Sequence, residues 1–348
     1  MTGRPSVVHR RRLVAQRLTD PPAETVAETV GHLLAVQAQD PRGFRLALRA
    51  RTRGLHVSDV DRALSEERSV VVSWLNRGTL HLVRNEDYWW LHALTAPTLA
   101  TANNRRLGQE GVGPDDAERG IAIIRSTVSS NGPTGRRELR DRLASAGVPV
   151  AGQAVVHLLY AATLLGLVVR GPVIRGDQAF VGVEDWLGRS PEFPDRDVLL
   201  GELARRYLAG HGPATDRDLA KWSGLPVRDA RRGFTEIADD LVDCGAGLVD
   251  LAGRSAGDPG VPPPLLLGSF DPLLLGWASR EDVLGDHPGV VTTNGVFRPV
   301  VLVNGRVVGT WGLPRGRATL NPTTRLTAAT RSALAAEAAA VERFLDLN

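Results

Sequence analysis

The sequence has almost no cysteine and no long apolar run, and both shortages exclude classes of protein. Its 348 residues include one cysteine, Cys244, which rules out an internal disulfide and a cysteine-based zinc site. No run of about 18 apolar residues occurs, so we expect no transmembrane helix. The basic N-terminus lacks an apolar signal core. We therefore predict a cytoplasmic protein with no membrane partner.

Lysine is also nearly absent, because 41 of the 42 basic residues are arginine and only Lys221 is lysine. A DNA lyase that works through a Schiff base needs an amine nucleophile, and only this one side chain could supply it. Residues 1–56 hold ten arginines against four acidic residues. Arginine binds phosphate through two parallel hydrogen bonds, so a polyanionic partner is one reading of this segment. A solvated arginine-rich surface is the other.

Motifs for metal or nucleotide chemistry are missing as well. There is no Walker A sequence, no HExxH and no EF-hand loop. The stretch GRSAG (253–257) matches a nucleophile elbow, but DPGVPPP follows it where a helix is required. His32, His81 and His92 have no ligand-like spacing. We therefore expect no metal site and no cofactor.

An internal repeat is the main architectural signal. The segments 131–147 and 211–224 align at an offset of 80 residues, and each reads as a turn, a short helix, a glycine turn and a second helix. Thr134 and Thr215 are the candidate N-caps of the first helices. Helix, glycine turn, helix is typical of helix-turn-helix motifs.

Strand pairs follow these helices and favour winged helices over other small helical modules. Segment 167–182 reads as two strands around a turn, as does 241–252, and 69–83 has the same form around Arg77-Gly78. After a Gly/Pro-rich segment, Asn304-Gly305 marks a further hairpin, and 327–345 is an alanine-rich helix. We predict a predominantly helical α+β fold, with three tandem winged-helix units and a C-terminal β-rich domain. The predicted boundaries are 1–112, 113–192, 193–262 and 263–348.

Five stretches in the same order along the chain resemble one family. They are LLAVQAQDPRG, SWLNRGTLHLV, HGPATDRDLAKWSGL, GSFDPLLLGWASR and GVFRPVVLVNGRVVGTW. Together they resemble the tandem winged-helix DNA glycosylases typified by the azinomycin-resistance glycosylase AlkZ. The resemblance covers nearly the whole chain. It implies excision of alkylated purines, including N7-linked guanine adducts and interstrand crosslinks, from double-stranded DNA.

The resemblance also implies a catalytic motif of glutamine, an apolar residue and glutamine, here Gln37-Ala38-Gln39. Some relatives carry Asp at the third motif position, whereas this sequence keeps Gln39, as the antibiotic self-resistance branch does. In an α-helix, residues i and i+2 lie about 200° apart, but in an extended chain they share a face. Because Pro41 disfavours a helical Asp40, we predict that helix 23–36 ends at the motif and that both glutamines point the same way.

The remaining candidate site residues are inferred only from their positions in the sequence. Asn76, Arg77 and His81 surround the first predicted wing and are candidate DNA-binding residues, although Arg77 could simply cap the turn. Arg298 and Arg306 flank the Asn-Gly hairpin and could reach a groove, or could be ordinary exposed arginines.

For Trp222 and Trp311 we favour core packing over base stacking. Asp271 reads as a buried residue that holds a junction rather than as a catalyst.

The sequence thus supports two functions. The first is a monomeric, monofunctional DNA glycosylase that hydrolyses the N-glycosidic bond of N7-alkylated guanine, in DNA repair or antibiotic self-resistance. The second is a tandem winged-helix transcription regulator without catalysis, since the fold serves both uses. The glutamine pair and the lack of an evident effector domain favour the enzyme.

Overall fold

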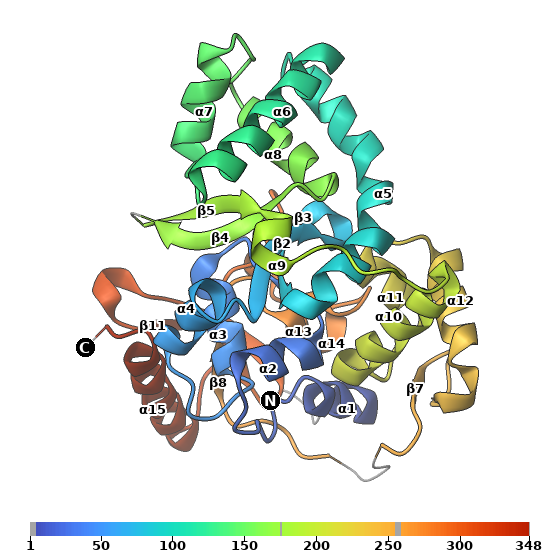
Figure 1. Cartoon of the computed structure of the whole chain (residues 1–348). Helices are drawn as coiled ribbons and strands as arrows, with labels where there is room; N and C mark the ends of the chain where they lie inside the picture. Colours follow the sequence, from blue (N-terminus) through green and yellow to red (C-terminus); the bar gives the residue numbers. More distant parts are fainter. Residues whose placement is uncertain (1–4, 175, 255–258, 348) are drawn as a thin grey trace. The chain divides into compact units, whose positions relative to one another are not determined.

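Residues 5–174, 176–254 and 259–347 are described by the computed structural model (Figure 1). The chain divides into two compact units, of which the second is inserted into the first. Unit 1 contains residues 1–60 and 195–348, and unit 2 contains residues 61–194. The division falls inside helix α4 (Val57–Ser65). The GRSAG match of the sequence lies mostly outside the described residues.

The first half of unit 1 is helical. Its elements are α1 (Val7–Ala15), α2 (Val26–Leu33), the two-residue strand β1 (Val36–Gln37), α3 (Pro41–Arg49), α10 (Arg196–His211), α11 (Asp216–Ser223), α12 (Val227–Glu236) and the hairpin β6 (Leu241–Asp243) with β7 (Val249–Leu251). Thr215 caps α11 in a capping box with Asp218, as the repeat predicts. Trp222 is 3 % exposed and therefore belongs to the core.

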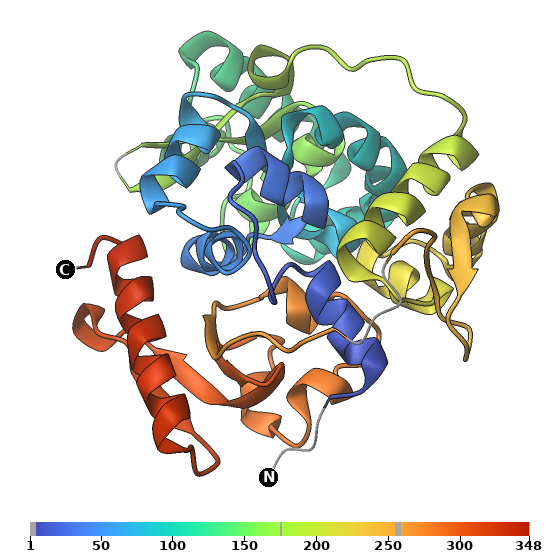
Figure 2. The ribbon, with the colours of Figure 1, turned by 90° about the horizontal axis from the view of Figure 1, so that it is seen from below.

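The second half of unit 1 is the predicted β-rich part with its terminal helix. An antiparallel sheet runs in the order β11-β10-β9-β8. Its elements are β8 (Leu265–Leu267), β9 (Val300–Val303), β10 (Arg306–Gly312), β11 (Thr319–Pro322), the short helices α13 (Pro272–Leu275) and α14 (Glu281–Leu284), and α15 (Ala328–Phe344). Figure 2 shows α15 beside the sheet. Trp311, Leu334 and Val341 pack in the core between them, so Trp311 is a core residue as expected.

Unit 2 consists of helices packed on a four-stranded antiparallel sheet, β3-β2-β4-β5. Its elements are β2 (Val70–Leu75), β3 (Thr79–Arg84), α5 (Asn85–Gln109), α6 (Pro114–Asn131), α7 (Arg136–Ser145), α8 (Ala154–Leu164), β4 (Val168–Ile174), β5 (Asp177–Gly182) and α9 (Val183–Leu187). Leu139, Leu158 and Phe180 are fully buried in its core.

One predicted helix cap in unit 2 is wrong. The N-cap of α7 is Gly135, whereas Thr134 exchanges backbone hydrogen bonds with Phe180 in an isolated bridge. Pairing with a distant strand therefore takes Thr134 out of the capping position.

No helix in the described part of the chain is both long and apolar enough to cross a membrane. Over the same residues, no group of three or more His, Cys, Asp or Glu side chains could hold a metal ion.

Candidate functional site

The glutamine motif lies in an irregular connection between α2 and α3 in unit 1. Helix α2 begins with a capping box between Thr25 and Glu28 and ends where Leu34 adopts a left-handed backbone with φ 65°. Gln37 then belongs to β1, and Asp40 is extended, with φ −107° and ψ 112°. The predicted helix over 23–36 does end before the glutamines, but it spans only Val26–Leu33. Pro41 does not stop α2, which already ends at Leu33; it occupies the first turn of α3 behind the Asp40 N-cap.

Both glutamine side chains lie on the same side of the chain. The amide nitrogen Nε2 of Gln37 donates a hydrogen bond to Oε1 of Gln39. Gln37 is 8 % exposed, whereas Gln39 is exposed to solvent. Since the bond uses one lone pair of Gln39 Oε1, that oxygen keeps a second lone pair for a water or a substrate. The pair therefore offers oriented dipoles at the surface that do not titrate.

Helix α3, which follows the motif, is held in place near both of its ends. Near its start, a Cβ on Gly43 would lie 2.4 Å from the carbonyl oxygen of Ser269, so the helix approaches this loop more closely than a side chain permits. Just beyond its C-terminus, Arg51 donates to Asp271 at 2.7 and 3.0 Å, and both side chains are 0 % exposed. Asp271 also caps α13. This geometry agrees with the structural role expected of Asp271. The ion pair holds α3 in place, and with it the glutamine segment that precedes α3.

Three predicted DNA-binding residues lie on the β2–β3 hairpin of unit 2, and two of them are buried. Asn76 is 0 % exposed, and neither its amide nitrogen nor its amide oxygen has a hydrogen-bond partner among the described residues. His81 is 1 % exposed, and its Nδ1 donates to the Thr79 carbonyl at 2.9 Å. Burial lowers the pKa of His81 to about 3, so the ring is neutral at pH 7. Arg77 forms the turn with φ 53° and is half-buried.

The other two predicted DNA-binding residues, Arg298 and Arg306, lie in different surroundings in unit 1. The Asn304-Gly305 turn exists as predicted, but its tip packs on α1, where His9 Nε2 donates to the Gly305 carbonyl at 2.7 Å. Gly305 is buried against the helix, and only Asn304 of this tip is exposed. Arg306 is half-buried beside it, whereas Arg298 is exposed.

Sequence reasoning missed a second turn next to Arg298. Its signal was present, because Asn294-Gly295 is a further Asn-Gly pair. A short bridge joins Val291 to Phe297, and the residues between Thr292 and Phe297 are exposed. Gly295 has φ 73° and open space around it. This turn, and not the Asn304-Gly305 turn, protrudes from unit 1.

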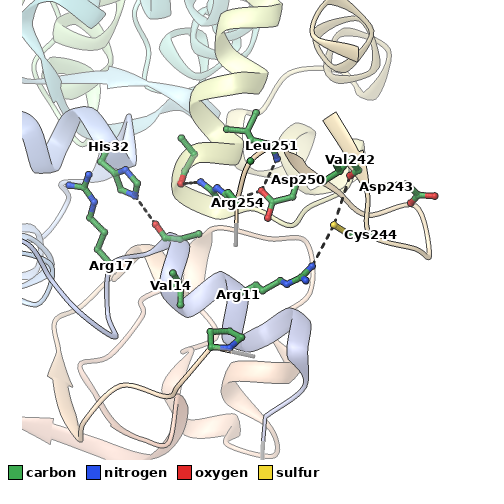
Figure 3. A pocket seen from close by; sticks show the side chains of 14 residues that line it. Arg11, Val14, Arg17, His32, Val242, Asp243, Cys244, Asp250, Leu251 and Arg254 are labelled. Carbon is green, nitrogen blue, oxygen red and sulfur yellow. Dashed lines mark hydrogen bonds and ion pairs between the residues drawn. The ribbon is translucent and has the colours of Figure 1, made fainter. Parts of the chain in front are cut away.

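A cavity of about 700 Å³ lies elsewhere in unit 1, and the glutamines do not line it (Figure 3). Arg11, His32, Cys244 and Arg254 are among its lining residues. Burial lowers the pKa of His32 to about 4 and raises the pKa of the Cys244 thiol. With its pKa lowered to about 4, the ring is a weak base, and the raised pKa of the thiol disfavours the thiolate nucleophile.

Three comparisons with known proteins identify the family and agree with the fold. A family model described as "DNA glycosylase AlkZ-like" matches residues 30–344. The chain is 27 % identical over 326 residues to an interstrand DNA cross-link repair glycosylase of Streptomyces sahachiroi, covering 86 % of this chain and 85 % of that protein. The solved structure of Streptomyces sahachiroi DNA glycosylase AlkZ matches with a TM-score of 0.80 at 26 % identity, over 97 % of this chain and 95 % of that one. The chain is thus a DNA glycosylase, an enzyme that hydrolyses N-glycosidic bonds, and it belongs to the AlkZ-like family.

Proposed function

We propose that this enzyme hydrolyses the N-glycosidic bond of N7-alkylated guanine in double-stranded DNA, with Gln37 and Gln39 as its catalytic residues. The observation that carries the proposal is the contact between the two amides at the end of β1. A regular helix would direct them about 200° apart, whereas here Nε2 of Gln37 meets Oε1 of Gln39 and the two amides lie together.

Amides suit this substrate because the leaving group is already activated. Alkylation at N7 places a positive charge on guanine, so the C1′–N9 bond can break without prior protonation of the base. The bonding electrons pass to the purine, which leaves as a neutral base, and water adds its oxygen to C1′ and releases a proton to solvent. Amide oxygens orient that water and stabilise the cationic sugar in the transition state.

The product of this reaction is an abasic site, without cleavage of the DNA backbone. Lys221 is the single lysine, and it lies exposed in the last turn of α11. A Schiff-base lyase would depend on this one amine. We therefore assign a monofunctional reaction.

The substrates we propose include bulky adducts and interstrand crosslinks, in DNA repair or antibiotic self-resistance. The name of the Streptomyces sahachiroi relative supports the crosslink. We further propose a cytoplasmic monomer with winged-helix units at 1–112, 113–192 and 193–262 and a β-rich domain at 263–348. The helix pairs α7–α8 and α11–α12, each followed by a hairpin, support two of these units.

Among the five predicted DNA-binding residues, Arg77 and Arg298 keep that role in the proposal. Arg298 is exposed beside the 292–296 turn, and Arg77 is half-buried at the hairpin bend. Asn76 and His81 are too buried to touch DNA in this conformation, and Arg306 lies beside the covered tip. We assign these three to shaping the hairpins that carry the exposed residues.

The test uses duplex DNA with a single N7-methylguanine or a nitrogen-mustard crosslink, followed by alkali. The wild-type enzyme should produce alkali-labile sites. Gln37→Ala and Gln39→Ala should each lower the single-turnover rate by at least about a hundredfold, the usual size of one lost electrostatic donor or acceptor, while DNA binding stays. The exposed Gln109 on α5 supplies the matched control Gln109→Ala, which should cleave normally. Binding without any alkali-labile product would favour the transcription regulator instead.

A further inference from the structure

Helix α7 of unit 2 presents arginines that nothing in the described chain neutralises. Arg136, Arg137 and Arg140 are exposed, and none of them forms an ion pair with a described residue. The helix buries only Leu139 and Leu143, and it lies beside α6 (Figure 1). One side of α7 therefore has no protein partner.

The three arginines form one continuous stripe on that helix. At about 100° per residue, Arg140 lies roughly 40° around the axis from Arg136 and one turn along it, and Arg137 lies about 60° further round. Glu138 falls on the opposite flank, where Arg142 donates to it at 3.1 Å. The remaining acid, Asp141, lies about 40° around the axis from Arg137 and one turn along it, at the edge of the stripe. Three arginines beside one acid leave the stripe with an excess of positive charge.

Arginine at the start of a helix is electrostatically unfavourable, which makes this placement informative. Arg136 and Arg137 are the first two residues of α7, at the positive end of the helix dipole. Arg136 also acts on Arg170, whose pKa falls to about 10 through burial first and through the nearby Arg136 charge in addition. In the isolated protein, this concentration of positive charge adds no stabilising interaction.

The second copy of the repeat keeps only one of these arginines, since Arg217 occupies the position of Arg137. In α11, Asp216 occupies the position of Arg136, and the buried Ala220 occupies that of Arg140. Asp216 accepts from Arg231 at 2.6 Å, so this copy places its helix against protein. The first helix of the module therefore packs against protein in the second copy, whereas in the first copy the same positions face solvent and carry arginines.

We propose that the Arg136–Arg137–Arg140 stripe is a DNA-binding surface that contacts the phosphate backbone irrespective of base sequence. Charge complementarity identifies the occupant, because exposed guanidinium groups bind phosphates bidentately. The proposal takes DNA as partner from the proposed function, but it does not depend on the glutamine pair or on the lesion.

The test is the salt dependence of binding by the full-length protein to an undamaged, fluorescently labelled duplex. In the triple variant Arg136→Ala/Arg137→Ala/Arg140→Ala, the slope of log K against log salt should become shallower by about 2 to 3, since each phosphate contact contributes about 0.9. Affinity at about 0.1 M salt should fall at least tenfold by the same relation. The triple Arg-to-Lys variant, which keeps the charge, should retain most of the slope.

The control variant Arg105→Ala/Arg106→Ala/Arg119→Ala removes the same charge from exposed positions on α5 and α6 and should leave the slope nearly unchanged. An unchanged slope in the α7 variant, or an equal loss in the control, would overturn the proposal. Single-turnover excision at saturating enzyme should stay within twofold of wild type in the α7 variant. If wild type releases no base from alkylated DNA, the proposed function fails, while the slope on undamaged DNA still decides the role of α7.

Discussion

Replacing Asp271 by alanine should destabilise unit 1 severely, because it would leave a buried guanidinium without its counter-charge. Arg51 donates two hydrogen bonds to Asp271, at 2.7 and 3.0 Å, and one each to Gln16 and the Ala47 carbonyl. Breaking one partner of such a fully buried pair costs about 3–5 kcal/mol. Asp271 also accepts from the Leu273 backbone as the N-cap of α13, which adds about 1 kcal/mol. The sum approaches the whole stability of many domains.

Urea unfolding followed by tryptophan fluorescence measures this loss at pH 7.5. The double variant Arg51→Met/Asp271→Leu removes both charges, and it should cost clearly less than the sum of the two single changes. A loss below about 1 kcal/mol in Asp271→Ala would refute the reasoning. So would a variant of normal stability that no longer excises alkylated bases, because Asp271 would then act in catalysis.

Three further changes test other parts of the structure. The buried rings of His32 and His211 have pKa values of about 4 and about 3, so they stay unprotonated in the folded state, whereas histidine in the unfolded chain takes up a proton below about pH 6.5. The free energy of unfolding should therefore fall between pH 7 and pH 5, by up to about 1.4 kcal/mol per pH unit for each ring. A free energy of unfolding that does not change over this range would contradict the prediction. Gly305→Ala should lower the free energy of urea unfolding by about 2 kcal/mol or more, because the added Cβ would lie 2.4 Å from Leu13 of α1. Gly295→Ala is the control, since Gly295 has a similar φ but open space around it. Equal losses of stability in the two variants would rule out the packing on α1. Thr215→Ala should lower the free energy of unfolding by about 1 kcal/mol through loss of its capping box, and no change would show that the cap contributes nothing.

Features that depend on neighbouring residues were predictable from the sequence. Asn304-Gly305 forms a turn because asparagine and glycine adopt left-handed backbone angles at low cost, and Gly78 does the same after Arg77. The non-helical Gln37-Ala38-Gln39 segment was predicted from Pro41 and from the opposite phases of i and i+2 in a helix, although the helix already ends at Leu33.

Features set by distant residues were not predictable in the same way. Thr134 pairs with Phe180, and its equivalent in the second copy, Ala214, pairs with Val249 in the same way. The residue that follows the bridge caps the helix in each copy, and it is Gly135 in the first and Thr215 in the second. Likewise, nothing near Asn304 indicates that α1 covers the turn, since His9 lies almost 300 residues away in sequence. The burial of Asn76 also arises from tertiary packing. The choice between a protruding turn and a covered one therefore needed the structure.

The insertion of unit 2 into unit 1 has a consequence during protein synthesis. Arg51 and its partner Asp271 are separated by 220 residues, so α3 cannot gain its buried ion pair until most of the chain has been made. At about 5–20 residues per second, translation of that interval takes roughly 10–45 s. Unit 2 is contiguous and can fold during this delay, whereas the glutamine segment waits for its anchor. The nascent chain therefore acquires an ordered glutamine segment only near the end of translation.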